Sequence, residues 1–207
     1  FPLRLVGSEM CIRDRPLVVM RWLFWFLNFK MTRFLILFLF VSSWLGAQQL
    51  RVETDTSEIS YEASHVVHDW SGTSKQVQGV VVLENAVPTR IAIVTSVASF
   101  DSRNESRDAH ALEVLEALLF PKVSFYSDKL SLEGETLSIT GNLKFHGKTI
   151  SLTTTANWVK KDDVWIFEGD FDFKPSEFDI TLPAFMLVKI RDNIHISFRL
   201  ELRTFVS

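Results

Sequence analysis

Three neighbouring side chains, Arg107, Asp108 and His110, resemble a catalytic group, and Asp108 and His110 are of the types that carry out general acid–base chemistry. A carboxylate and an imidazole so close together could form the proton-transferring pair of a hydrolase or an isomerase. If a helix begins here, however, Asp108 meets free backbone amides, and Arg107 can pair with it or with a loop acid. No serine stands in a Gly-x-Ser-x-Gly turn, so we assign no nucleophile. We favour structural roles for all three residues and expect no catalysis.

Histidines are the other candidates for chemistry, as metal ligands. Zinc sites need three or four convergent ligands at short spacings. The five histidines are instead widely scattered: His65, His68, His110, His146 and His195. We therefore expect no metal and no other cofactor. The single cysteine, Cys11, lies near the N-terminus, so the rest of the chain forms no disulfide and is compatible with an oxidising compartment.

The N-terminal region differs in composition from the rest. Residues 31–47, MTRFLILFLFVSSWLGA, combine a basic start, an apolar run and a small-residue end, which is the layout of a secretory signal peptide. We expect cleavage after Ala47 and a periplasmic or secreted protein. An uncleaved anchor is the alternative, although the run is shorter than the roughly 20 residues of a membrane span. Residues 1–30 include LVGSEMCIRD, which resembles a translated sequencing adapter, and are interpreted as an upstream artefact. Met20 and Met31 are both candidate starts.

The mature part, residues 48–207 beginning at Gln48, is long enough for one domain. It has 16 Lys and Arg against 23 Asp and Glu, a net charge of −7 with neutral histidines. Nucleic-acid binding depends on clustered cations, whereas Lys160 and Lys161 are followed directly by two aspartates. The charge therefore argues against a nucleic-acid partner.

Period-two alternation of apolar and polar residues dominates this mature part and predicts an all-β fold. The clearest run, residues 194–202, has Ile194, Ile196, Phe198, Leu200 and Leu202 on one face. Eight to nine such runs are typical of a sandwich or of a small closed barrel, and closure leaves no exposed strand edge. The turn signal Asp192-Asn193 predicts a hairpin between 185–191 and 194–202.

One helix interrupts the strands. Ser102 and Glu105 have the spacing of a capping box, leucines between residues 112 and 119 predict an apolar face, and Pro121 prevents further winding. We expect this helix to pack on one end of a barrel or to plug it.

Four ordered motifs carry a resemblance to the YceI-like family of lipid- and polyisoprenoid-binding proteins. They are HDWSGTS at 68–74, SFDSRNESRDAH at 99–110, FPKVSF at 120–125 and GNLKFHG at 141–147. The chain departs from the family at Lys148-Thr149, where members often carry Val-Thr-Lys. The resemblance implies an eight-stranded, antiparallel, lipocalin-like β-barrel with one short helix near its opening. It also implies export to the periplasm, an isoprenoid or fatty chain held inside, no enzymatic activity, and pairing as a homodimer in some members.

The family motifs and the alternation together nominate site residues. The motif residues are interpreted as structural, with Trp70 as a loop anchor rather than a ligand stacker: Asp69, Trp70, Asp101, Asn104, Arg107, Asp108 and His110. The residues expected to line a ligand cavity are Val97, Val123, Phe125, Leu143, Phe145, Trp165, Phe167, Phe171, Phe173, Ile196 and Phe198.

Four functions remain open at this point. The favoured one is a periplasmic carrier for an isoprenoid, quinone-like or fatty-chain ligand. The alternatives are a lipid-modifying hydrolase or isomerase using His110 and Asp108, a filled barrel that acts through its loops, and an outer-membrane barrel. The last requires apolar residues outside and a polar lumen, and alternation alone does not tell which face is outside. The mid-chain helix and the strongly aromatic strands fit a soluble barrel better, so we expect no stable membrane insertion of the mature domain.

Overall fold

The computed structural model describes residues 48–66, 68–134, 136–185 and 188–205. The described residues belong to one compact unit. The predicted artefact at 1–30, with Cys11, and the predicted signal peptide at 31–47 lie outside the described residues and stay predictions.

Strands and one α-helix follow one another along the described chain, as period-two alternation predicts. Their bounds are β1 Gln48–Val52, β2 Glu58–Ser64, β3 Asp69–Ser74, β4 Val77–Glu84, β5 Val87–Ser96, α2 Glu105–Val114, β6 Lys122–Glu133, β7 Thr136–Phe145, β8 Lys148–Lys161, β9 Val164–Phe173, β10 Ala184–Phe185, β11 Val188–Lys189 and β12 Ile194–Thr204. Short 3₁₀ turns occupy Val97–Ser99 and Pro175–Phe178.

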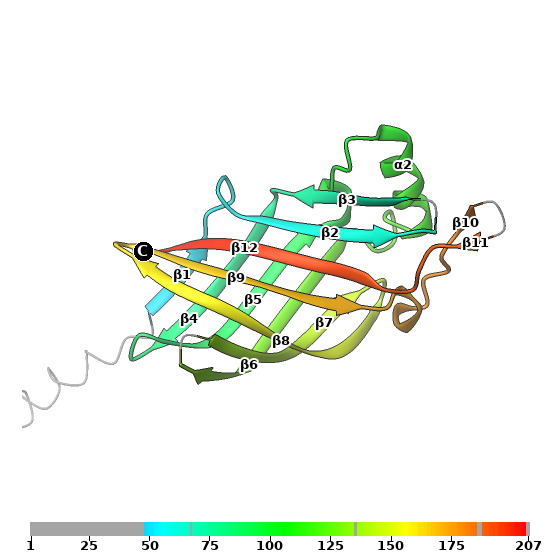
Figure 1. The fold of residues 1–207 in the computed structure, drawn as a ribbon. Helices are drawn as coiled ribbons and strands as arrows, with labels where there is room; N and C mark the ends of the chain where they lie inside the picture. Colours follow the sequence, from blue (N-terminus) through cyan, green and yellow to red (C-terminus); the bar gives the residue numbers. More distant parts are fainter. Residues whose placement is uncertain (1–47, 67, 135, 186–187, 206–207) are drawn as a thin grey trace, which may run out of the picture. The chain divides into compact units, whose positions relative to one another are not determined.

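Eight strands close into an antiparallel barrel in the order β1-β4-β5-β6-β7-β8-β9-β12 (Figure 1). The ring closes where β12 pairs with β1, with Leu50 opposite Thr204. The β2–β3 hairpin continues along the other half of β12. Two backbone hydrogen bonds of 3.0 Å between Thr73 and Asp101 then tie β3 to the loop before α2. The predicted eight-stranded antiparallel barrel with one helix is therefore confirmed.

The pairing of β9 with β12 shows how alternation sorts the side chains. Phe171 and Ile196 are opposite each other and face the interior. Glu168 and Arg199, also opposite each other, form an ion pair on the outer surface. Apolar side chains therefore point inward and charged ones outward, as expected for a barrel with an apolar lumen. No helix in the described ranges has the length and apolar character that crossing a membrane requires.

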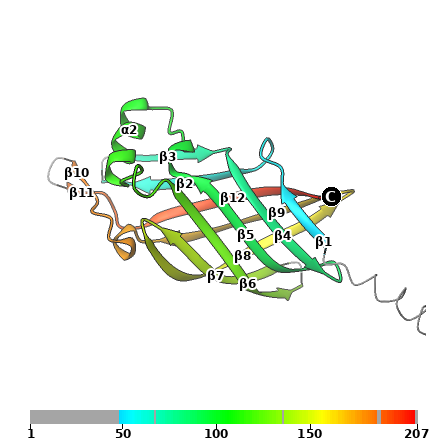
Figure 2. The ribbon, with the colours of Figure 1, turned by 180° about the vertical axis from the view of Figure 1, so that it is seen from behind.

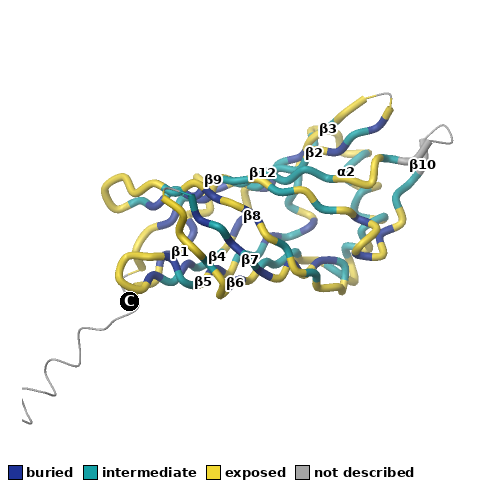
Figure 3. The backbone as a smooth tube through the Cα atoms, turned by 60° about the horizontal axis from the view of Figure 1, so that its bottom comes forward, coloured by how far each residue is buried: buried dark blue, intermediate teal, exposed yellow. Residues whose placement is uncertain are grey.

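The two ends of the barrel are built differently. At the end formed by β1, here called the filled end, fully buried side chains pack the lumen: Leu50, Val77, Val81, Leu83, Leu137, Trp165 and Leu202. At the opposite end, here called the helix end, α2 and the turn Pro175–Phe178 cover the strands (Figure 2). A smaller cluster there joins Leu143, Phe145, Phe178 and Ile180 to apolar residues of α2. Figure 3 shows the buried positions alternating along the strands.

The helix differs from its predicted form. Its N-cap is Asn104, whose side-chain oxygen accepts a hydrogen bond of 3.1 Å from the Arg107 N–H, so the capping box predicted at Ser102 is wrong. The helix also ends earlier than predicted, because Glu116 adopts a left-handed backbone with φ 46°. Leu118 beyond it is 100% exposed and contributes nothing to an apolar face.

The hairpin predicted between 185–191 and 194–202 does not form. β10 and β11 pair with each other, and β12 already has β9 on one side and β1 and β2 on the other. Because both edges of β12 are occupied, no position remains for another strand. Asp192 instead accepts a hydrogen bond of 3.0 Å from the backbone N–H of Ser176.

Candidate functional site

A cavity of about 330 Å³ lies inside the helix end of the barrel. Apolar side chains from β2, β4, β5, β6, β7, β8, β9 and β12 form its wall, and Ala111 of α2 with the C-cap residue Leu115 closes it at the helix end. Its floor includes Leu200 and Leu202, which belong to the filled-end core. The volume is at the lower end of the roughly 300–1,000 Å³ typical of small-molecule sites. The barrel is thus packed at one end and hollow at the other.

Ten of the eleven residues nominated from the sequence line this cavity. They are Val97, Val123, Phe125, Leu143, Phe145, Phe167, Phe171, Phe173, Ile196 and Phe198. Alternation placed them on the inward face, and the strands that carry them extend to the helix end. Their contact with a ligand stays a prediction.

Trp165 is the exception and lies in the filled end instead. Its ring stacks on that of Trp158, with centroids 5.2 Å apart and planes 12° apart, and the residue is 3% exposed. Lys160 Nζ lies 5.3 Å from the centroid of the same ring. Trp165 faces inward like Phe167 but lies closer to the filled end. Alternation alone does not show how far along the barrel a residue lies.

Several cavity-lining residues were not nominated from the sequence. They come from strands β2 and β5, from the loop before α2, and from α2 with its C-cap, and include Ile59, Tyr61, Ile91, Ile93, Phe100, Leu112 and Leu115. The alternation of residues 91–97 was a usable signal for β5. The apolar face predicted for the helix was a signal for Leu112 and Leu115, but which helix residues reach the cavity depends on how α2 docks.

The hydroxyl groups inside the cavity already have partners. Thr154 donates a hydrogen bond of 2.8 Å to the carbonyl of Asp170. Thr95 lies 3.1 Å from the hydroxyl of Ser74 and 3.3 Å from the carbonyl of Gln76. Because these groups are satisfied by the barrel itself, the interior offers a bound molecule an essentially apolar surface.

Polar groups gather at the rim of the cavity, where β2 and β3 meet α2. Both oxygens of the Asp108 carboxylate accept hydrogen bonds from the backbone N–H of Ser102, at 3.3 and 3.1 Å. The Arg107 guanidinium lies 5.8 Å from the centroid of the Trp70 ring. His110 Nδ1 faces Glu113 at 3.5 Å, and its side chain is 60% exposed. Asp108 and His110 thus have separate partners and form no hydrogen-bonded acid–base pair in the described structure.

Tyr61 lies within this rim and is electrostatically coupled to it. Burial raises the pKa of the Tyr61 hydroxyl above its usual value, and the negative charge of Asp108 raises it further. The positive charge of Arg107 acts in the opposite direction. Tyr61 was not nominated from the sequence. In the structure it lies on β2 opposite Ile196, which was nominated, and both line the cavity.

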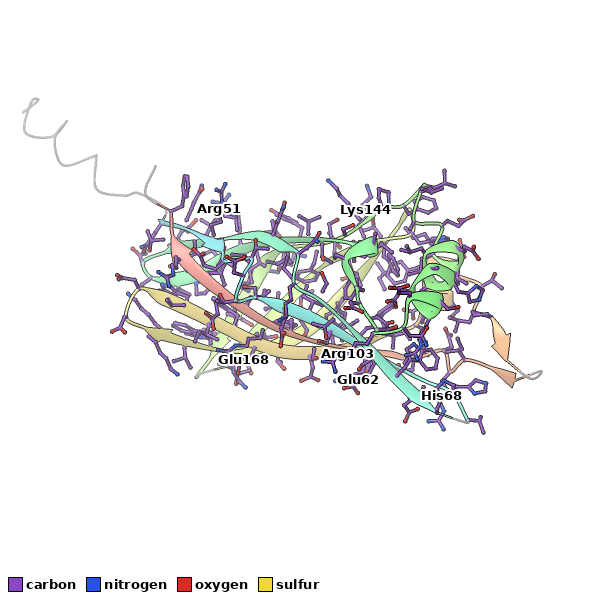
Figure 4. The ribbon with its side chains drawn as sticks, turned by 90° about the horizontal axis from the view of Figure 1, so that it is seen from above. Arg51, Glu62, His68, Arg103, Lys144 and Glu168 are labelled. Carbon is purple, nitrogen blue, oxygen red and sulfur yellow. The ribbon has the colours of Figure 1, made fainter. Side chains whose placement is uncertain are left out.

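The other motif residues build the scaffold around the rim. Asp69 begins β3, and Asn104 caps α2. The backbone of Asp101 pairs with Thr73, and its side chain accepts a hydrogen bond of 2.6 Å from the Arg103 N–H. Figure 4 shows the labelled His68 on the β2–β3 hairpin, at the same end as α2.

The histidines are distributed among unrelated contacts. His65 and His68 have ring centroids 6.3 Å apart, His146 lies against Phe178, and His195 pairs with Asp172. Within the described ranges, no group of three or more His, Cys, Asp or Glu residues could hold a metal ion.

Comparison with solved structures identifies the same fold in other proteins. BcnA of Burkholderia cenocepacia superposes with a TM-score of 0.67 at 20% identity, covering 72% of this chain and 98% of that one. A polyisoprenoid binding domain from Saccharophagus degradans, implicated in plant cell wall breakdown, superposes with a TM-score of 0.62 at 10% identity, covering 75% of this chain and 98% of that one.

Sequence comparison gives the family. Protein YceI of Salmonella newport is 29% identical over 134 residues, which cover 59% of this chain and 70% of that protein. Residues 50–202, nearly the whole barrel, match the family described as YceI-like domain. The chain therefore belongs to the YceI-like domain family.

Proposed function

We propose that this protein is a carrier that holds an isoprenoid, quinone-like or fatty-chain molecule inside its barrel and performs no chemistry on it. The observation that carries the proposal is the apolar cavity of about 330 Å³ whose internal hydroxyls are already bonded. Burying a hydrocarbon chain there would contribute about 0.8 kcal/mol per methylene. The similar domain from Saccharophagus degradans, which is described as polyisoprenoid binding, supports the same ligand class.

Two alternatives fit the site less well. A hydrolase or isomerase using His110 and Asp108 needs the two side chains to work on one substrate atom, but Asp108 is held by the backbone N–H of Ser102. A wholly filled barrel does not describe the helix end, where the cavity lies.

The test is to express the full chain in a bacterium with a periplasm, purify the product, and record its native mass before and after solvent extraction. We expect a stoichiometric extra mass that extracts as an unmodified isoprenoid or fatty compound. A clean apo mass that persists after a challenge with such lipids would reject the carrier function. The native mass also shows whether the protein forms the homodimer that the resemblance allows.

We further propose that the protein acts in the periplasm, on the basis of the predicted signal peptide at 31–47. N-terminal sequencing of the same product should begin at Gln48. A product that retains residues 31–47 and sediments with membranes would instead identify an uncleaved anchor.

A further inference from the structure

The polarity of the cavity changes sharply from the interior to the rim. Among the described residues that line it, the titratable side chains all come from β2 and α2 at the rim: Tyr61, Arg107, Asp108 and His110. Further in, Thr95 and Thr154 have their hydroxyls bonded to the barrel. A polar head group placed inside would lose its water and gain no partner, which is unfavourable. The head group of any amphiphilic ligand must therefore lie at the rim.

Arg107 is the rim cation with unused donor groups. Its guanidinium carbon lies 5.8 Å from the centroid of the Trp70 ring, and no described carboxylate forms an ion pair with it. The adjacent acid, Asp108, turns both carboxylate oxygens to the Ser102 N–H. A guanidinium carries N–H groups along its edges, and these match the planar oxygens of a carboxylate or the oxygens of a phosphate.

We infer that the ligand is an amphiphile with an anionic head group, a carboxylate or a phosphate, which binds Arg107 at the rim while the apolar tail fills the cavity. The inference rests on the proposed carrier function and adds the class and the orientation of the ligand. The Tyr61 hydroxyl and the His110 imidazole line the same rim and offer additional donors.

The experiment compares three ligands with one tail, namely dodecanoate, dodecyl phosphate and methyl dodecanoate. Protein expressed from the full chain is purified, and dissociation constants are measured near neutral pH by displacement of a fluorescent apolar probe. We expect either anionic ligand to bind about ten-fold more tightly than the neutral ester, which is the size of one charge-assisted hydrogen bond. The carboxylate and phosphate measurements show which of the two head groups is preferred.

Variants of Arg107 then test whether this side chain causes the preference for anionic ligands. Arg107→Gln should remove the preference for the anionic ligands and leave the affinity for the ester unchanged, whereas Arg107→Lys should keep part of it. Arg103→Gln is the matched control, because Arg103 lies on the loop before α2 and does not line the cavity (Figure 4). It should keep the full preference. A merely structural role for Arg107 would change all three affinities together.

The outcomes separate the inference from the carrier function on which it rests. Equal affinities for the acid and the ester, or a preference that survives in Arg107→Gln, would overturn the head-group inference while ester binding upheld the carrier function. Failure of all three ligands to displace the probe would reject both. If Arg107→Gln does not fold, as judged by circular dichroism, the wild-type comparison and Arg107→Lys still decide.

Discussion

His146 Nδ1 donates a hydrogen bond of 2.9 Å to the backbone carbonyl of Phe178, because a carbonyl oxygen only accepts. Nε2 of the same ring lies 3.0 Å from Oε2 of Glu116 as an ion-pair contact without hydrogen-bond geometry, and the His146 side chain is only 10% exposed. One residue in the β7–β8 turn therefore connects the two segments that close the helix end, namely the chain after α2 and the turn Pro175–Phe178.

Replacing His146 should loosen this closure. His146→Asn suits the left-handed backbone at this position, where φ is 47°, but the shorter amide cannot reach Phe178 and Glu116 together. The buried Phe178 carbonyl loses its partner, so the free energy of unfolding should fall by about 1–3 kcal/mol. Denaturant unfolding measures this loss. In the control His195→Asn, which disrupts an exposed pair with Asp172, the change should stay within about 1 kcal/mol. Equal losses in the two variants would show that His146 does not hold the closure.

The raised pKa of Tyr61 makes a prediction for alkaline pH. The folded protein keeps the Tyr61 proton at pH values where the unfolded chain has released it. The free energy of unfolding should therefore fall as pH rises above about 10. In a Tyr126→Phe background, which leaves one of the two tyrosines, the tyrosinate absorbance reports this residue alone.

Charge removal tests the cause of that shift. Asp108→Asn removes the nearby negative charge, and its amide oxygen can still accept a hydrogen bond from the Ser102 N–H, so the Tyr61 pKa should move back toward its usual value. An unchanged titration would show that Asp108 does not influence Tyr61.

A substitution at the filled end should lower mainly the stability of the barrel, and a substitution in the cavity wall should lower mainly its ligand affinity. Trp165→Ala removes a buried ring from the stack with Trp158 and should cost about 3–5 kcal/mol of unfolding free energy, with little effect on affinity. Phe171→Ala removes part of the cavity wall and should mainly weaken ligand binding. Denaturant unfolding and probe displacement on the same samples measure the two quantities. A larger loss of affinity in Trp165→Ala than in Phe171→Ala would contradict this division.

The helix surface offers a direct test of where the ligand lies. Ala111 of α2 lines the cavity, so the indole of Ala111→Trp should occupy space that a tail would use. Displacing about two methylene groups costs roughly 1.6 kcal/mol, or about ten-fold in affinity. Ser106→Trp adds the same side chain to an exposed position of the same helix and should bind as the parent does. A similar affinity in both variants would place the ligand elsewhere.

The face of each strand was predictable from the sequence. Phe171 and Phe173 on β9 and Ile196 and Phe198 on β12 were all expected to face inward, and all four line the cavity. The prediction succeeds because successive side chains of a strand point to opposite sides whatever the partner strand is. The helix was less predictable. Asn104 caps α2 although Ser102 has the spacing of a capping box, because the local backbone rather than residue type decides which side chain reaches a free N–H.

The sequence by itself determined the all-β class, the inward and outward faces of the strands, the family resemblance and the acidic balance of residues 48–207. Only the tertiary structure decided depth: Trp165 and Phe167 share one face of β9 and both pack the filled-end core, yet only Phe167 also lines the cavity. It also brought Arg107 against Trp70 and Asp108 near Tyr61. The physical reason is that periodicity is a property of one strand, whereas depth and rim contacts depend on the register in which distant strands close and on where the helix docks.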